Sequence, residues 1–135
     1  MIIGLVACCK KKMNWAVPAG MMYRSPLFHF RSAFVEKTCD DWYILSAKYG
    51  LVHHNTVIEP YNISLHEMNV MERIEWAKMT GEQIKTLNAT RLIVFARGVY
   101  LLALDKIEYE SPLKGINPIG KQIVWLKKET NRTFW

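Results

Sequence analysis

Three short apolar runs, separated by segments with helical patterns, constrain the fold of this chain more than any other feature. They cover residues 1–7, 42–45 and 91–96. Short runs with almost no polar side chains are typical of strands that are buried on both faces, as in a parallel sheet. A weaker fourth strand is indicated at residues 106–109. The sequence therefore predicts an α/β fold: a three-layer domain with a small, mostly parallel central sheet of about four strands flanked by helices.

Helix signals lie between these runs. Ser25 followed by Pro26 predicts a helix start, with serine as the N-cap and proline at the first helical position. The apolar residues that follow recur at spacings of three and four, which predicts a stripe facing the core. This stripe consists of Leu27, Phe30 and Phe34. A last helix is predicted by the spacing of Ile119, Ile123 and Leu126.

A longer amphipathic helix is predicted in the middle of the chain. Ser64 and Glu67 have the spacing of a capping box, in which each side chain bonds the backbone N–H of the other residue. We expect the helix to begin there and to be broken by Gly81. Its predicted core stripe consists of Leu65, Met68, Met71 and Ile74.

Composition limits the functions that are open to the chain. Its 135 residues are half apolar, which suits one folded domain spanning residues 1–135. No apolar run could cross a bilayer, and the first positive charges follow the initial apolar stretch, the reverse of a secretory signal. We therefore expect a cytoplasmic protein with no membrane partner. The three cysteines are odd in number and lack metal-ligand spacing, so they predict neither a disulfide framework nor a metal site. The sequence indicates no cofactor. It leaves the oligomeric state open.

Polar residues follow each apolar run, where the predicted strands end. Ligands of open α/β sheets bind beyond the carboxyl ends of the strands, so we expect these side chains to converge on one pocket that attracts anions. The residues concerned are Cys8, Cys9, Lys10 and Lys12 after the first run, Ser46, Lys48, Tyr49 and Gly50 after the second, and Arg97 and Tyr100 after the third. Further binding candidates lie in the connecting segments: Tyr23, Tyr61, Ser111, Leu113, Lys114 and Lys121.

Glu59 is the candidate catalytic carboxylate. Ser46 and Lys48 are the other catalytic candidates. Glu59 precedes Pro60, which restricts its backbone to extended conformations and fixes the direction of the chain. A carboxylate in such a stiff segment near a polar loop is a candidate general acid or base. The alternative interpretation is an ordinary surface glutamate.

Three segments together resemble the YaaA peroxide-stress family and an allied family of uncharacterised bacterial and phage domains. They are ACCKKK at residues 7–12, YILSAKYGLV with VIEPYNISL within residues 43–65, and FARGVY at residues 95–100. The middle segment is the most specific of the three. The YaaA family is associated with DNA binding and with limiting oxidative damage, so the resemblance implies a YaaA-like domain with a DNA partner.

The sequence ESPLKGINPIG at residues 110–120 is similar to a loop of the uracil-DNA glycosylase superfamily that enters the minor groove. In that resemblance Ser111, Pro112 and Leu113 match the loop, and Leu113 would fill the gap left by a flipped base. The first strand is followed by Cys8, Cys9 and Lys10 where that superfamily has an acidic residue that activates water. Standard uracil excision is therefore not expected.

These observations leave three functions open. The first is a DNA glycosylase-like hydrolase acting on a modified or damaged base, with Tyr49 or Tyr61 stacking on the base, Glu59 as the carboxylate, and Ser46 and Lys48 holding a phosphate or base edge. The second is a DNA-binding module without catalysis, which the net charge of +6 permits. The third is a hydrolase of a small nucleotide or N-riboside. A solvated basic surface accounts equally for the charge.

Overall fold

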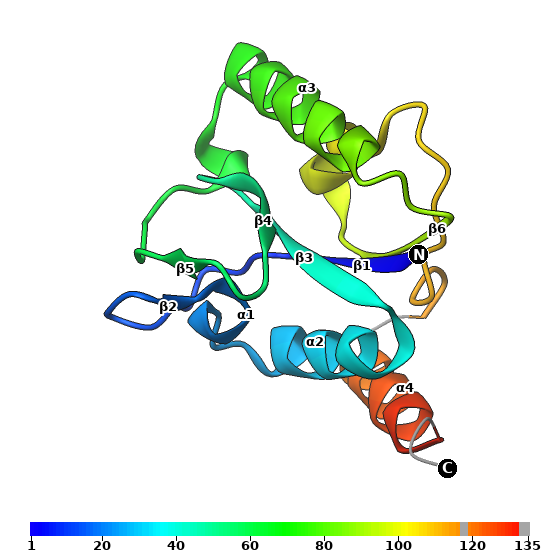
Figure 1. Ribbon diagram of the computed structural model, residues 1–135. Helices are drawn as coiled ribbons and strands as arrows, with labels where there is room; N and C mark the ends of the chain where they lie inside the picture. The colour runs from blue at the N-terminus through cyan, green and yellow to red at the C-terminus, as the bar shows by residue number, and fades with distance from the viewer. Residues whose placement is uncertain (117–118, 133–135) are drawn as a thin grey trace.

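A four-stranded sheet lies between two layers of helices in the computed structural model, which describes residues 1–116 and 119–132 (Figure 1). The sheet order is β4-β3-β1-β6. Its strands are β1 Ile2–Ala7, β3 Asp41–Ser46, β4 Gly50–His53 and β6 Arg91–Phe95. One layer contains α2 Pro26–Thr38 and α4 Ile119–Arg132, and the other contains α3 Val70–Thr86 and the 3-10 helix η2 Gly98–Leu104 (Figure 1). The predicted α/β class and the predicted three layers are confirmed.

The three predicted apolar runs form the parallel part of the sheet. β1 is central and pairs in parallel with β3 on one side and β6 on the other. Five of its six residues are buried, because helices cover both of its faces. The carboxyl ends of β1, β3 and β6 consequently lie along the same edge of the sheet.

The fourth strand lies elsewhere than predicted. β4 follows β3 in a tight reversal and pairs with it antiparallel, so that Ser46 lies opposite Gly50. Gly50 has a φ of +71°, a conformation that residues with a side chain rarely adopt. Residues 106–109 do not form a strand. The signal for β4 was weak because the strand has only four residues, of which two are buried.

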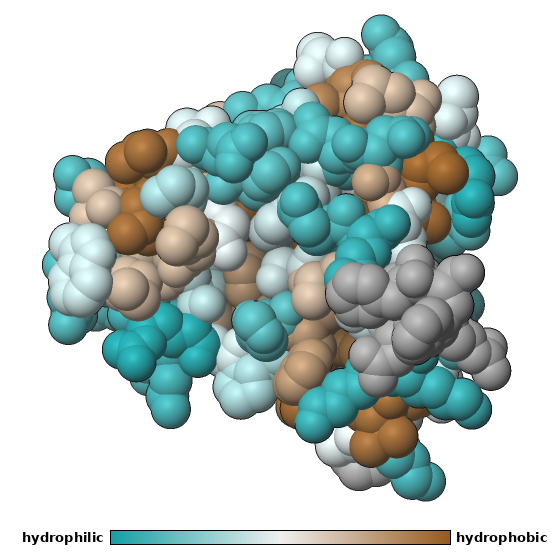
Figure 2. All heavy atoms as spheres, turned by 60° about the horizontal axis from the view of Figure 1, so that its bottom comes forward, coloured by the Kyte–Doolittle hydropathy of each residue, from teal (hydrophilic) through white to brown (hydrophobic). Residues whose placement is uncertain are grey.

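A small two-stranded sheet projects from the β4 side of the domain (Figure 1). It is formed by β2 Val17–Pro18 and β5 Val57–Ile58, next to the short helix α1 Ala19–Met22. Apolar side chains gather at this end of the molecule, whereas hydrophilic residues cover much of the rest of the face shown in Figure 2. The large exposed apolar residues of these elements and the loop before them are Trp15, Met21 and Val57.

The start of α2 is as predicted, but its buried face is not. Ser25 Oγ accepts a hydrogen bond from Phe28 N at 3.0 Å, and Pro26 occupies the first helical position. The buried residues are Phe28, Arg31 and Val35, whereas the predicted stripe is only partly buried. The helix is rotated because Gly4 of β1 admits Val35: a Cβ at Gly4 would lie 2.6 Å from Val35 Cγ1.

The long helix begins later than predicted. Ser64 caps only the 3-10 turn η1 Leu65–Glu67, accepting from His66 N. The capping box that opens α3 is formed by Asn69 and Glu72. Gly81 does not break α3, since it lies inside the helix where a Cβ would be 2.9 Å from the carbonyl oxygen of Ala103.

The predicted core stripe of this helix is correct only in its first half. Leu65 is fully buried and Met68 is partly buried against the same core, but both precede α3. Met71 is 64% exposed and Ile74 is 51% exposed. The residues of α3 that face the sheet and η2 are Trp76, Thr80, Gly81 and Ile84. Close contact at Gly81 and burial of Trp76 determine the rotation of the helix, and methionine spacing does not.

Both edges of the sheet are hydrogen-bonded to segments that are not strands. On the β4 edge, Leu51 N donates to Gln83 Oε1 of α3 at 3.0 Å. On the β6 edge, Val94 N donates to Glu110 O and Glu110 N donates to Leu92 O, each at 2.8 Å. In the part of the chain that the structure describes, no helix is long and apolar enough to span a membrane.

Candidate functional site

Two pockets lie at the carboxyl edge of the sheet. The first, called here the β1-end pocket, has a volume of about 330 Å³ and opens beside the loop that follows β1. It is lined by Cys8, Cys9, Lys10, Lys12, Asn62, Ile63, Ser64, His66, Glu67 and Tyr100. The loop after β1, the segment ending in η1, and the start of η2 each contribute to it. All of these residues except Ile63 have polar or ionisable side chains.

The second, called the β6-end pocket, has a volume of about 420 Å³ and lies where β6 ends. It is lined by Arg31, Val94, Phe95, Ala96, Arg97, Gly98, Leu101, Tyr109, Ser111, Leu113, Lys114 and Gln122. Tyr100 and Leu101 are neighbours in η2 but line different pockets. The first turn of η2 therefore separates the two pockets.

A buried network of hydroxyl groups centres on Ser46, at the end of β3. Ser46 Oγ donates to Tyr61 Oη at 2.8 Å, and Tyr61 Oη lies 2.8 Å from Tyr23 Oη. Ser46 Oγ also accepts from the backbone N–H groups of Lys48 and Tyr49. These bonds join the turn between β3 and β4 to two tyrosines from distant segments. The network therefore holds the β3–β4 turn and the two tyrosines in place at the carboxyl edge of the sheet.

The hydroxyl groups of this region stay protonated at neutral pH. Burial raises the pKa of Tyr23, Tyr61 and Tyr100 well above the usual value of a tyrosine. Proximity to Cys8 raises the pKa of Tyr61 and Tyr100 further. These side chains consequently keep their hydroxyl protons and do not act as bases, and Tyr61 also accepts a hydrogen bond from Ser46.

The loop after β1 is held against this network. Cys8 Sγ lies 3.1 Å from Tyr100 Oη, and Cys9 Sγ donates to the carbonyl oxygen of Lys11 at 3.4 Å. Lys12 Nζ donates to the carbonyl oxygen of Lys10 and lies 4.4 Å from the centre of the Tyr61 ring. A cation at this distance from an aromatic face is attracted to it. The positive charge of Lys12 is thereby held over the hydroxyl network.

The structure distributes the predicted site residues over several places. Those in the β1-end pocket are Cys8, Cys9, Lys10, Lys12 and Tyr100. Those in the β6-end pocket are Arg97, Ser111, Leu113 and Lys114. Those within or beside the hydroxyl network are Tyr23, Ser46, Tyr49 and Tyr61, while Gly50 packs against α3. Those that line neither pocket also include Lys48, Glu59 and Lys121.

The expected single pocket is therefore not observed, because Cys9, Ser46, Lys48 and Glu59 share no cavity. Ser46 is fully buried and uses its hydroxyl group within the fold. Glu59 is exposed, and its backbone oxygen accepts from Tyr49 Oη at 3.4 Å. The strand ends do converge on one edge, but η2 and the tyrosine pair divide the space between them.

Leu113 is not available to enter a duplex. It is 8% exposed and belongs to the core cluster between the sheet and the layer of α2 and α4. The apolar side chain of this loop turns inward because α2, α4 and the end of β6 offer it an apolar environment. The expectation that Leu113 fills a gap in DNA is corrected accordingly.

Several site residues were missed by sequence reasoning. Glu67 and His66 line the β1-end pocket, although the sequence signal at Glu67 was interpreted as helix capping. Arg31 and Gln122 line the β6-end pocket from two helices. The position of Arg31 and Gln122 depends on how the two helices pack. The only local sequence signal was that Arg31 is a single charged residue among apolar neighbours.

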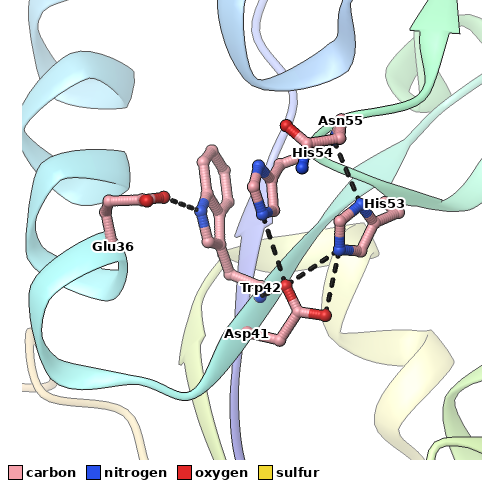
Figure 3. A network of polar contacts seen from close by, with 6 residues as sticks. All are labelled: Glu36, Asp41, Trp42, His53, His54 and Asn55. Carbon is pink, nitrogen blue, oxygen red and sulfur yellow. Dashed lines mark hydrogen bonds and ion pairs between the residues drawn. The ribbon is translucent and has the colours of Figure 1, made fainter.

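A third polar cluster lies at the opposite edge of the sheet, where β3 begins (Figure 3). His53 Nε2 lies 2.8 Å from Asp41 Oδ1, and His54 Nε2 lies 3.3 Å from the same atom. The ring of His54 stacks on Trp42, whose indole N–H donates to Glu36 Oε2. Burial acts to raise the pKa of the Asp41 carboxyl group, but hydrogen bonds from Trp42 N–H and His53 and the two histidines lower it overall.

The ligand atoms of Asp41, His53 and His54 lie within 4.8 Å of one another, a spacing compatible with a metal ion. However, Asn55 N donates to His53 Nδ1 at 3.1 Å, which assigns the ring proton to Nε2. That proton is donated to Asp41, so the Nε2 lone pair needed by a metal is not available in this arrangement. The cluster is accounted for as a hydrogen-bonded link between β3 and the end of β4.

The comparisons with known proteins give one match. No curated protein and no solved structure matches the chain. Residues 3–128, which include every residue that lines the two pockets, match a family of unknown function, DUF6884. The match extends over most of the 135 residues. The chain therefore belongs to the DUF6884 family.

Proposed function

We propose that this domain acts on nucleic acid as a DNA glycosylase-like hydrolase, and that the β1-end pocket receives a modified or damaged base. One observation carries the proposal: the pocket combines two lysines, a tyrosine and a carboxylate at the carboxyl edge of the sheet. Ligands of open α/β sheets bind at this edge. The resemblance of residues 7–12 and 43–65 to the DNA-associated YaaA family adds support.

The chemistry of the pocket suits a base that has left its stack. Lys10 and Lys12 offer positive charge to the flanking phosphates, and Tyr100 offers an aromatic ring beside the base. A volume of about 330 Å³ accommodates a ligand of the size of one nucleoside. Cys8 and Tyr100 both line the pocket, and Cys8 Sγ is hydrogen-bonded to Tyr100 Oη at 3.1 Å.

Glu67 takes the catalytic role that the sequence suggested for Glu59, since Glu67 is the carboxylate that lines the pocket. Cleavage of an N-glycosidic bond develops positive charge on the sugar, which a carboxylate stabilises while it orients a water molecule. Water adds to the sugar carbon, the bond to the base breaks, and the base leaves with a proton from that water. Ser46 and the tyrosines position the pocket and take no part in the step.

The test is to incubate the protein with duplex and single-stranded oligonucleotides carrying varied modified bases, and to identify released bases by mass spectrometry. We expect Glu67→Gln to reduce base release about 100-fold or more without reducing oligonucleotide binding. Glu59→Gln is the matched control, because it removes the same charge from an exposed position outside both pockets. Loss of release in E59Q but not in E67Q would reject the assignment.

A small nucleotide or N-riboside is a second candidate substrate, which the modest volume of the pocket favours. The two substrates are distinguished by salt, because binding to a DNA strand weakens steeply as counterions compete for its phosphates. Release of bases from free nucleosides at a rate unaffected by salt would favour the small substrate. Salt-dependent binding to DNA, with no base released from any substrate, would support a DNA-binding module without catalysis.

A further inference from the structure

Arg31 is a charged side chain in a buried position. It lies on the buried face of α2 between Phe28 and Val35 and is only 8% exposed. Among residues 1–116 and 119–132, its one hydrogen bond is from Nη2 to Gln122 Oε1, at a long 3.4 Å, and its buried Nε atom has no partner there. A buried guanidinium is costly unless it is paired, and proteins normally provide a carboxylate for it.

No carboxylate serves Arg31 among residues 1–116 and 119–132, where the ion pairs involve other groups. A second cation, Arg97, lies just beyond the end of β6, and its charge acts on Arg31. Burial and the charge of Arg97 lower the pKa of Arg31 to about 10, so the side chain is still charged at neutral pH. The fold thus brings two positive charges together and leaves both without a counterion in this region.

The β6-end pocket lies directly at these two arginines. Lys114 adds a third positive side chain and Ser111 adds a hydroxyl group, whereas none of the described lining residues is acidic. Gly98 has a φ of +55°, and a Cβ built on it would meet no atom within 4 Å, so the backbone leaves this side open. The pocket therefore contains three positive charges, space of about 420 Å³ and no internal anion.

We propose that the β6-end pocket binds a phosphate group, with the buried guanidinium of Arg31 as its anchor and Arg97 and Lys114 at its mouth. A phosphate oxygen accepts strong hydrogen bonds from a guanidinium and supplies the missing charge. Ser111 donates a further hydrogen bond from its hydroxyl group. The phosphate belongs either to a free phosphate or phosphomonoester, or to the backbone of a nucleic acid. This site is separate from the β1-end pocket and does not depend on the function proposed there.

The test uses the full chain and measures thermal unfolding with increasing inorganic phosphate, compared with sodium chloride at the same ionic strength. We expect phosphate to raise Tm by about 5 °C at ten times its dissociation constant, since a ligand of the folded state stabilises by mass action. Arg31→Met should abolish the phosphate-dependent rise while leaving the phosphate-free Tm equal to or above that of the parent protein. A merely structural arginine would instead lower the phosphate-free Tm and leave the phosphate response unchanged.

Arg97→Gln keeps the proposal testable if R31M does not fold, because Arg97 is exposed. We expect R97Q to weaken phosphate binding about tenfold or more. Lys128→Gln is the control, since it removes one exposed positive charge of α4 outside the pocket and should change nothing. An equal response in R97Q and the parent protein, or an equal effect of chloride, would overturn the proposal.

A short single-stranded oligonucleotide of unmodified sequence identifies the source of the phosphate. An Arg97-dependent rise in Tm with the oligonucleotide but not with phosphate assigns the pocket to a nucleic-acid backbone. A rise with inorganic phosphate alone assigns it to a free phosphate or phosphomonoester. No rise with either probe rejects the site. Failure of base release in the preceding experiment has no bearing on these outcomes.

Discussion

At the scale of single residues, the structure of the carboxyl edge depends on buried polar groups that hydrogen-bond to one another. Ser46 occupies the centre of this arrangement, because its hydroxyl group both donates to Tyr61 and accepts from the backbone of the following turn. It is fully buried, so water cannot replace these bonds. The residue marked in the sequence as a catalytic candidate is in the structure an internal hydrogen-bond junction.

Ser46→Ala tests this role. We expect a loss of about 1–3 kcal/mol in the free energy of unfolding, because buried donors and acceptors lose their partner. Chemical denaturation measures the loss. Ser32→Ala is the comparison, since the hydroxyl group of Ser32 bonds only the preceding turn of α2 at an exposed position. Equal effects of the two substitutions would contradict the importance of the network.

Asp41 predicts a dependence of stability on pH. Its pKa is lower in the folded protein than in the unfolded chain, so its contribution is present above the unfolded pKa. That contribution is lost as the pH falls through the folded pKa, below about pH 4. We expect Asp41→Asn to lower the urea midpoint at pH 7, and we expect the difference from the parent protein to shrink at pH 3.

Asp105→Asn is the control for this measurement, because Asp105 is an exposed carboxylate away from the histidines. It should shift the midpoint little at either pH. A difference between D41N and the parent protein that stays constant from pH 7 to pH 3 would show that the ionised carboxylate is not the stabilising group.

At the scale of elements, the three parallel strands were easier to predict than the faces of the helices. These strands are continuous apolar runs whose short length favours buried strands over buried helices. In α2 and α3, apolar side chains occur on more than one face, so their spacing does not determine which face is buried. The contacts of Gly4 with Val35 and of Gly81 with Ala103 decide it, and these are tertiary contacts.

The same reasoning explains which parts of the candidate site were predictable. Cys8 directly follows β1, Lys12 lies in the same loop, and Arg97 lies just beyond β6. The ends of these parallel strands must share an edge. Glu67 and Arg31 reach the pockets only through the placement of η1 and the rotation of α2. No local pattern encodes those two placements, so sequence reasoning alone could not find them.

Gly81→Ala tests the close contact between α3 and η2. The added Cβ would lie 2.9 Å from the carbonyl oxygen of Ala103, so the two elements must separate. We expect a loss of about 1–3 kcal/mol, despite the higher helix propensity of alanine. Gly120→Ala in α4 is the matched control, because its Cβ would meet no atom within 4 Å. It should be neutral or slightly stabilising in the same denaturation experiment.

At the scale of the whole molecule, the two core clusters lie on opposite faces of one sheet. The cluster on the α2 and α4 side contains Trp42, and the cluster on the α3 and η2 side contains Trp76. Each strand of the parallel part contributes residues to both clusters. Loss of one helix layer would therefore expose one face of the same strands that the other layer still covers.

This arrangement predicts a single cooperative unfolding transition. Tryptophan fluorescence and far-UV circular dichroism should give the same urea midpoint, and Ile84→Ala and Val35→Ala should each shift both signals together. Ile84 and Val35 belong to different clusters, which makes them a matched pair. Separate midpoints for the two signals in either variant would show that the layers unfold independently.

The bonding of the two outer strands by Gln83 and Glu110 has a consequence for assembly. Exposed strand edges are the places where foreign chains add themselves and where aggregation begins. Here the side chain of Gln83 in α3 accepts a hydrogen bond from the β4 edge, and the backbone of Glu110 is hydrogen-bonded to the β6 edge. A further strand could therefore add at either margin of the four-stranded sheet only after these hydrogen bonds were broken.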